Sequence, residues 1–146
     1  MEVLALRGRL GLTTLRRVLA GTKMIEFFVA GKPVPQGSLK FIKGHAIHQN
    51  ANNLATWRSD IASTGRKAGL VPTNRPVSIL LLFNMPRPKT VKRQMPTVPP
   101  DLDKLIRAVL DGLTGVAYED DSQVVRITAA KVYDRQMGVQ IGITNL

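Results

Sequence analysis

The chain has 146 residues, no cysteine and a hydrophobic fraction of 44%, which is typical of a single globular domain with one core. The absence of cysteine excludes disulfides, zinc–thiolate sites and a cysteine nucleophile, and it fits a reducing cytoplasm, where we expect the protein; no apolar run approaches the ~18 residues of a membrane span. The net charge of +11 favours a nucleic-acid partner over a basic protein whose excess charge only aids solubility.

Residues 1–23 differ from the rest of the chain. They carry five basic residues and one acid, and their leucines follow neither strict alternation nor a clean helical stripe. We therefore expect a basic, poorly ordered extension followed by one domain over residues 24–146. Since a regular alternating pattern begins at Met24, this residue is a candidate for the true start of the protein.

The first part of the domain reads as strands and loops. Residues 24–30 alternate as a strand, and residues 31–38 are expected to be a loop because their two prolines cannot donate to a sheet. Two short strands over residues 39–42 and 46–48 are expected to form a hairpin.

A helix is expected over residues 53–67, where apolar residues recur three or four positions apart. Either Asn50 or Asn52 is a suitable N-cap, and Gly69 is expected to end the helix. Residues 77–83 are almost continuously apolar and branched, which is typical of a central strand covered on both faces.

Residues 85–100 hold five of the nine prolines, so neither a helix nor a central strand is expected there. A loop of this length usually serves a function or is disordered, and we expect it to be mobile. Its basic side chains are candidates for contacts with DNA phosphates: Arg87, Lys89, Lys92 and Arg93.

A second helix is expected to begin with Asp103 as N-cap and to run to Leu113. Strands are expected over residues 124–132 and 138–143, with a turn at 134–138. The order β-β-β-α-β-α-β-β indicates a single α/β or α+β domain with one mixed sheet of five to six strands and two main helices.

The acidic residues are concentrated in one part of the chain. None occurs between residues 61 and 100, and six of the ten then follow within residues 101–121. In an extended segment Asp101 and Asp103 point the same way, and the connection after Leu113 is long enough to return Asp120 and Asp121 to them. Together these four carboxylates would bind a hard divalent cation.

A simpler interpretation stays open beside the metal site. Asp103 can be only a helix cap, and residues 119–121 only an acidic turn. Arg107, one turn after Asp103, can hold a phosphate and forms a polar stripe with Asp103 and Asp111. His45 and His48 lie in the expected hairpin, and we treat their spacing as incidental.

The segments Pro100-Asp101-Leu102-Asp103-Lys104-Leu105, Asp111-Gly112-Leu113 and Asp120-Asp121-Ser122-Gln123-Val124-Val125 resemble the RusA family of Holliday junction resolvases, in the same order and at matching spacing. The segment over residues 31–38 resembles the opening of its phage and actinobacterial members. The resemblance covers residues 24–143.

The resemblance implies a small homodimeric nuclease, found on phages and prophages, that resolves four-way DNA junctions by paired nicks with Mg²⁺ or Mn²⁺. It implies a role in DNA recombination and repair, in the cytoplasm of a bacterial or phage-infected cell. The essential aspartates of the family fall on Asp101, Asp103 and Asp121, with Asp120 beside them. Its basic catalytic residue, usually lysine, falls on Arg107, which cannot donate a proton near neutral pH. Lys104 is expected to point away from this stripe.

We therefore expect a metal-dependent endonuclease acting on branched DNA as a homodimer, because a junction presents two equivalent strands to a two-fold protein. Two alternatives remain from the sequence. One is a DNA-binding protein without catalytic activity, and the other is a less selective metal nuclease that acts on flaps, forks or single strands.

Overall fold

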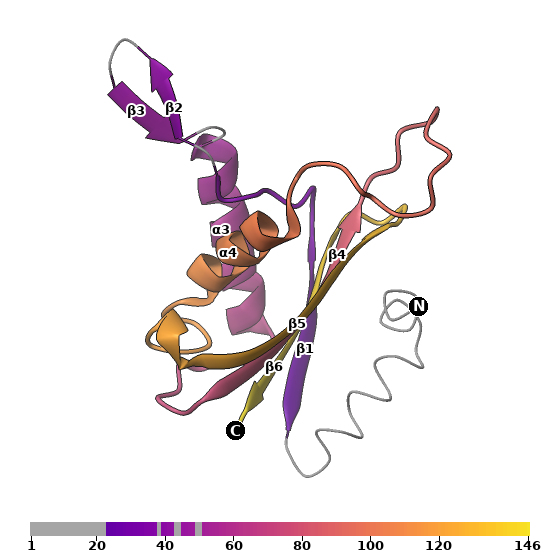
Figure 1. Ribbon diagram of the computed structural model, residues 1–146. Helices are drawn as coiled ribbons and strands as arrows, with labels where there is room; N and C mark the ends of the chain where they lie inside the picture. The colour runs from indigo at the N-terminus through magenta and orange to yellow at the C-terminus, as the bar shows by residue number, and fades with distance from the viewer. Residues whose placement is uncertain (1–22, 38, 43–44, 49–50) are drawn as a thin grey trace.

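The computed structural model describes residues 23–37, 39–42, 45–48 and 51–146 (Figure 1). The expected extension lies outside these residues except for Lys23, so its order and the alternative start at Met24 stay predictions. The elements are β1 (Met24–Ala30), β2 (Leu39–Ile42), β3 (His45–His48), α3 (Ala51–Lys67), β4 (Val77–Met85), α4 (Leu102–Leu113), η1 (Asp121–Gln123), β5 (Val124–Tyr133) and β6 (Gly138–Asn145).

The main sheet has four strands in the order β1-β6-β4-β5. The β4–β5 pair is parallel, and the other two pairs are antiparallel. The expected α+β domain with a mixed sheet and two main helices is confirmed, but the sheet has fewer strands than the five to six expected. The difference is the hairpin, because within the described part of the chain β2 and β3 pair only with each other.

The segment after β1 explains why the hairpin does not join the sheet. It crosses to α4, where the backbone N–H of Gln36 donates to the Lys104 carbonyl at 3.0 Å. The chain therefore leaves the sheet edge before β2 begins, and the hairpin projects beyond one end of α3 (Figure 1).

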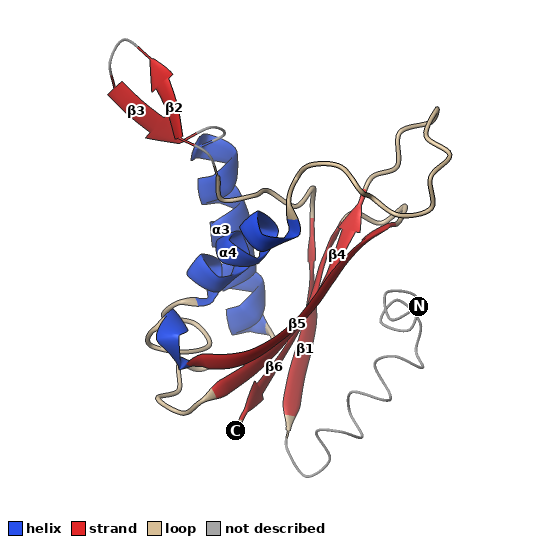
Figure 2. Cartoon of the chain, viewed as in Figure 1, coloured by secondary structure: helices blue, strands red, loops and turns tan. Residues whose placement is uncertain are grey.

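The main core lies between the sheet and the two helices, which cover the same face (Figure 2). β4 runs through its centre, and Leu81 and Phe83 are fully buried. Gly112 brings α4 against α3, since an added Cβ would lie 3.2 Å from the side chain of Ile61. A Phe83→Ala truncation in such a core would cost ~3–5 kcal/mol of unfolding free energy.

Two predicted helix boundaries are wrong. α3 begins at Ala51, so Asn52 lies inside the helix and is not its N-cap, while Asn50 is outside the described residues. The N-cap of α4 is Asp101, with extended backbone angles, and Asp103 lies in the first turn. The Asp101 carbonyl already accepts the Leu105 N–H at 3.1 Å, so the helix starts two residues earlier than predicted. Gly69 does follow the end of α3, with a φ of +100° that favours glycine.

A long loop over residues 86–100 joins β4 to α4, as predicted (Figure 2). It contains short-range turns, such as the Val91 N–H donating to the Pro88 carbonyl at 3.1 Å. No helix among the described residues is both long and apolar enough to cross a membrane.

Candidate functional site

The N-terminal end of α4 is fixed by a lysine on β5. Lys131 donates from Nζ to the carbonyl oxygens of Val98 and Pro100, both at 2.8 Å. Pro100 immediately precedes Asp101, so β5 determines where the first candidate carboxylate stands. This role of Lys131 was not predicted from the sequence, although a lysine between Ala130 and Val132 in a strand was a usable signal.

Asp101 and Asp103 are exposed at this end of the helix. Lys104 Nζ lies 3.7 Å from Asp101 Oδ2, in an ion pair that leaves both side chains partly accessible to solvent. Lys104 therefore faces Asp101, a candidate ligand outside the Asp103–Asp111 stripe from which the lysine was expected to point away. Arg107 is exposed one turn further along α4.

The second acidic segment is held as a tight turn by Gln123. Its Oε1 accepts the backbone N–H groups of Glu119 and Asp120 at 2.9 and 2.8 Å. Its Nε2 donates to the carbonyls of Thr73 and Arg75 at 2.7 and 3.0 Å. This one side chain thus anchors the acidic turn to the loop before β4.

Asp120 completes the turn as the N-cap of η1. Its Oδ1 accepts the Ser122 N–H at 2.8 Å, and this backbone hydrogen bond is the main reason why the pKa of Asp120 is lowered. Asp121 follows in the first position of η1 and is exposed. Asp120 therefore has a structural contact of its own, whereas Asp121 presents its carboxylate to solvent.

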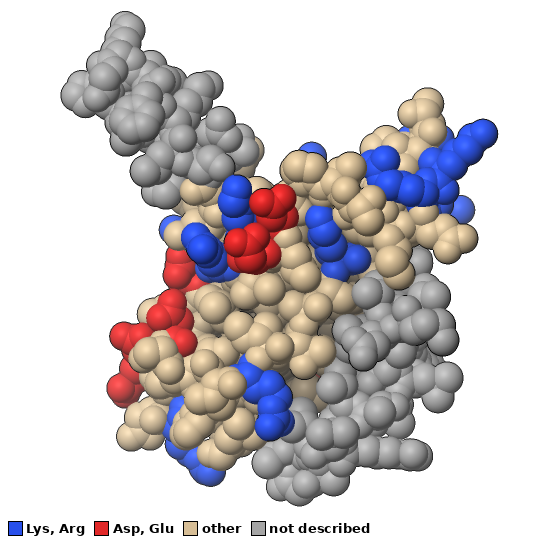
Figure 3. Space-filling view, viewed as in Figure 1, with Lys and Arg blue, Asp and Glu red and all other residues tan. Residues whose placement is uncertain are grey.

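The two acidic segments do not converge within one chain. Among the described residues, no three His, Cys, Asp or Glu side chains lie close enough together to hold a metal ion. Figure 3 shows the same separation, with acidic side chains in distinct groups on this face. The expectation that one chain gathers four carboxylates at the helix start is therefore wrong, even though chain length allowed it.

Tyr118 explains where the acidic turn goes instead. Its hydroxyl donates to the Leu110 carbonyl at 2.6 Å, so the chain after α4 stays at the C-terminal end of that helix. Burial is the main cause that raises the pKa of Tyr118, and the neighbouring carboxylates of Asp121, Asp111 and Asp120 add to the rise.

Asp111 is paired with a residue outside the predicted polar stripe. Arg58 of α3 donates from Nη2 to Asp111 Oδ2 at 3.0 Å and also to the Gln36 side chain. Asp111 therefore ties α4 to α3 and to the segment after β1. The polar stripe on α4 is accordingly divided, with Asp103 and Arg107 exposed and Asp111 engaged in packing.

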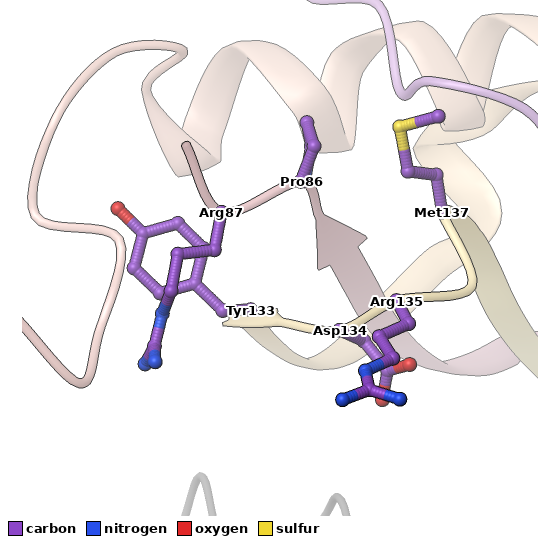
Figure 4. A pocket seen from close by; sticks show the side chains of 6 residues that line it. All are labelled: Pro86, Arg87, Tyr133, Asp134, Arg135 and Met137. Carbon is purple, nitrogen blue, oxygen red and sulfur yellow. The ribbon is translucent and has the colours of Figure 1, made fainter. Parts of the chain in front are cut away.

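Two arginines of the loop over residues 86–100 are organised by Tyr133, at the end of β5. The Arg93 Nε donates to the Tyr133 hydroxyl at 2.9 Å, and the Arg87 guanidinium lies 5.0 Å from the ring centre. Figure 4 shows Arg87 and Tyr133 among the side chains that line one pocket. Arg87 and Tyr133 also line a cavity of about 570 Å³ beside the β5–β6 turn. Lys89 and Lys92 are exposed. The basic side chains of the loop gather at the upper right of Figure 3.

Comparisons with known proteins point to one family. The family described as Endodeoxyribonuclease RusA matches residues 30–144, a range that includes every candidate site residue. The uncharacterized protein YqaN of Bacillus subtilis (strain 168) is 29% identical over 136 residues, which cover 82% of this chain and 94% of that protein.

Proposed function

Because the chain belongs to the RusA endodeoxyribonuclease family, we propose that it is a metal-dependent nuclease that resolves four-way DNA junctions by paired nicks. The observation that carries this proposal is the exposed pair Asp101 and Asp103 beside the basic loop. Carboxylates in this position would repel DNA unless a cation lies between them and the phosphates. The basic side chains of the loop supply the phosphate contacts.

One described chain does not offer three ligands to a metal ion. We propose that a homodimer does, with Asp101 and Asp103 from one subunit and Asp120 and Asp121 from the other. Mg²⁺ or Mn²⁺ suits these oxygen ligands. A divalent cation held there would polarise the scissile phosphate and lower the pKa of an attacking water.

The topology of β5 supports this arrangement. β5 is an edge strand of the described sheet, so its outer backbone groups are open to a second strand. Asp121 lies just before its start, and Lys131, which holds the Pro100 carbonyl, lies near its end. A second copy paired antiparallel along β5 would therefore place Asp120 and Asp121 of one subunit near Asp101 and Asp103 of the other. Val125 and Ile127 on this strand are 63% and 40% exposed, as expected for an uncovered apolar edge.

Two basic residues near Asp101 are candidates for phosphate binding and for proton donation. Arg107 can bind a phosphate oxygen through its guanidinium but cannot act as an acid near neutral pH. The Lys104 ammonium, 3.7 Å from Asp101, carries a proton that can be transferred to a departing oxygen. Lys104 is thus the candidate for the acid role, while Arg107 is the candidate for phosphate binding.

A synthetic four-way junction with Mg²⁺ or Mn²⁺ tests the proposal. Wild type should give paired, symmetric nicks, and Asp103→Asn or Asp121→Asn should abolish them while junction binding is retained. Binding without any nick would indicate a DNA-binding protein that lacks activity. Equal rates on flaps, forks and plain duplex would indicate a less selective nuclease. Either result contradicts the proposal.

A further inference from the structure

A small cavity lies under the basic loop and separate from the acidic residues. It has a volume of about 190 Å³ and is enclosed by the loop together with the ends of β4 and β5. Its walls include Pro88, Pro96 and Val98 from the loop, and Tyr133 from the sheet. Five of the lining residues are prolines, whose rings restrict the backbone, while Lys32, Met85, Arg93 and Lys131 contribute longer and more flexible side chains.

The size and lining of the cavity restrict what it can accept. Small-molecule sites usually measure ~300–1,000 Å³, whereas an apolar cavity of ~150 Å³ is enough for one benzene ring. Lys32, Arg93 and Lys131 are among the lining residues, and none of those identified is acidic. A small, largely apolar space with cationic side chains around it suits an aromatic ring attached to a polyanion, as a nucleobase is attached to its strand.

The position of the cavity relates it to the proposed cleavage site. Pro100 and Lys131 both line it, and the Lys131 ammonium donates to the Pro100 carbonyl at 2.8 Å. Asp101 is the next residue along the chain. A base in this cavity would therefore place its own backbone phosphates beside Asp101.

We propose that this cavity receives one unstacked base of the DNA strand next to the phosphate that is cut. The inference rests on the proposed nuclease function and adds a reason for its selectivity. Extruding a base from a continuous duplex is costly, but the cost falls where stacking is already interrupted, as at a branch point. The cavity would thus favour branched DNA over plain duplex without reading the junction as a whole.

The test changes one residue that lines the cavity and removes one base of the junction, separately and together, and compares the binding affinities. Val98 is 38% exposed and lines the cavity, so Val98→Phe fills the space from a position that tolerates a larger side chain. Val71→Phe is the matched control, since Val71 is 74% exposed and precedes the opposite end of β4. Junctions carrying an abasic site at each nucleotide around the branch point are titrated in Mg²⁺ with each protein in an Asp121→Asn background, which is expected to retain binding without cutting a strand.

For wild type and Val71→Phe, one abasic position should weaken binding at least fivefold. For Val98→Phe, the intact junction should bind more weakly, and the same abasic position should have no further effect. The inference is overturned if no abasic position weakens wild-type binding, or if Val98→Phe shows the same loss as wild type. The scan with wild type alone decides the question if Val98→Phe does not fold.

This experiment separates the inference from the proposed function. A base-dependent signal without nicking in Mg²⁺ would support the cavity and contradict the nuclease. Nicking without a base-dependent signal would support the nuclease and contradict the role of the cavity. Failure of wild type to bind the junction would contradict both.

Discussion

Lys131 Nζ lies 2.8 Å from the carbonyl oxygen of Pro100, so a side chain of β5 sets the position of Asp101 at the start of α4. Lys131→Met keeps most of the stem and removes both hydrogen bonds from the ammonium. We expect the nicking rate to fall roughly tenfold, the usual scale when a residue that orients a metal ligand is lost. Junction affinity should change much less.

The control for this prediction is Lys89→Met, an exposed lysine of the same loop. It should weaken junction binding slightly and leave the rate at saturating protein unchanged. Equal rates for Lys131→Met and wild type would show that the Pro100 contact does not position Asp101.

Gln123 is the central residue of the second acidic segment. Its side chain makes four hydrogen bonds that connect Glu119 and Asp120 to Thr73 and Arg75. Replacing it by leucine should lower the unfolding free energy by ~2–6 kcal/mol, since each of the four lost hydrogen bonds contributes about 0.5–1.5 kcal/mol. Urea unfolding measures this loss. Gln94→Leu, at an exposed glutamine, should leave the midpoint unchanged.

Asp111 is predicted to stabilise the packing of the two helices and not to bind the metal ion. Its partner Arg58 is 3.0 Å away, and both side chains are about one-third exposed. Asp111→Asn should therefore cost only ~0.5–1 kcal/mol of stability. Cleavage should continue at close to the wild-type rate, in contrast to Asp103→Asn. A complete loss of cleavage by a folded Asp111→Asn variant would show that Asp111 takes part in the cleavage site.

Tyr133 is expected to act through Arg93. Tyr133→Phe removes the hydroxyl that accepts the Arg93 Nε–H, and junction affinity should fall roughly three- to tenfold. The charge of the protein is unchanged, so the salt dependence of binding should keep its slope. Arg93→Ala, by comparison, should reduce that slope by about 1. A smaller slope for Tyr133→Phe would mean that the hydroxyl does not act by orienting Arg93.

Hydropathy alone predicted much of the fold. The run from Val77 to Phe83 gave a buried central strand because nearly every residue in it is apolar. The strand nevertheless continues to Met85, which pairs with Tyr133. Such pairing depends on a partner 48 residues away and leaves no local pattern, so the end of the strand could not be predicted.

The sequence was enough to select the candidate site residues, but their positions relative to one another could not be predicted. Asp101 and Asp103 both fit an N-cap, and only the backbone hydrogen bond from Leu105 decides between them. Chain length likewise permitted the acidic turn to return to the helix start. The contact of Tyr118 with Leu110 and the long-range contact of Gln123 with Thr73 determine that it does not.

Subunit mixing tests directly whether each metal site is shared between two subunits. If each metal site combines Asp103 of one subunit with Asp121 of the other, a heterodimer of Asp103→Asn and Asp121→Asn has one site with both changes and one intact site. The two variants are unfolded together, refolded as a mixture and assayed on a four-way junction with Mg²⁺. Each variant alone should be inactive, and the mixture should nick one strand without paired cuts if the site is shared. A mixture as inactive as its components, beside an active wild type, would contradict a shared site.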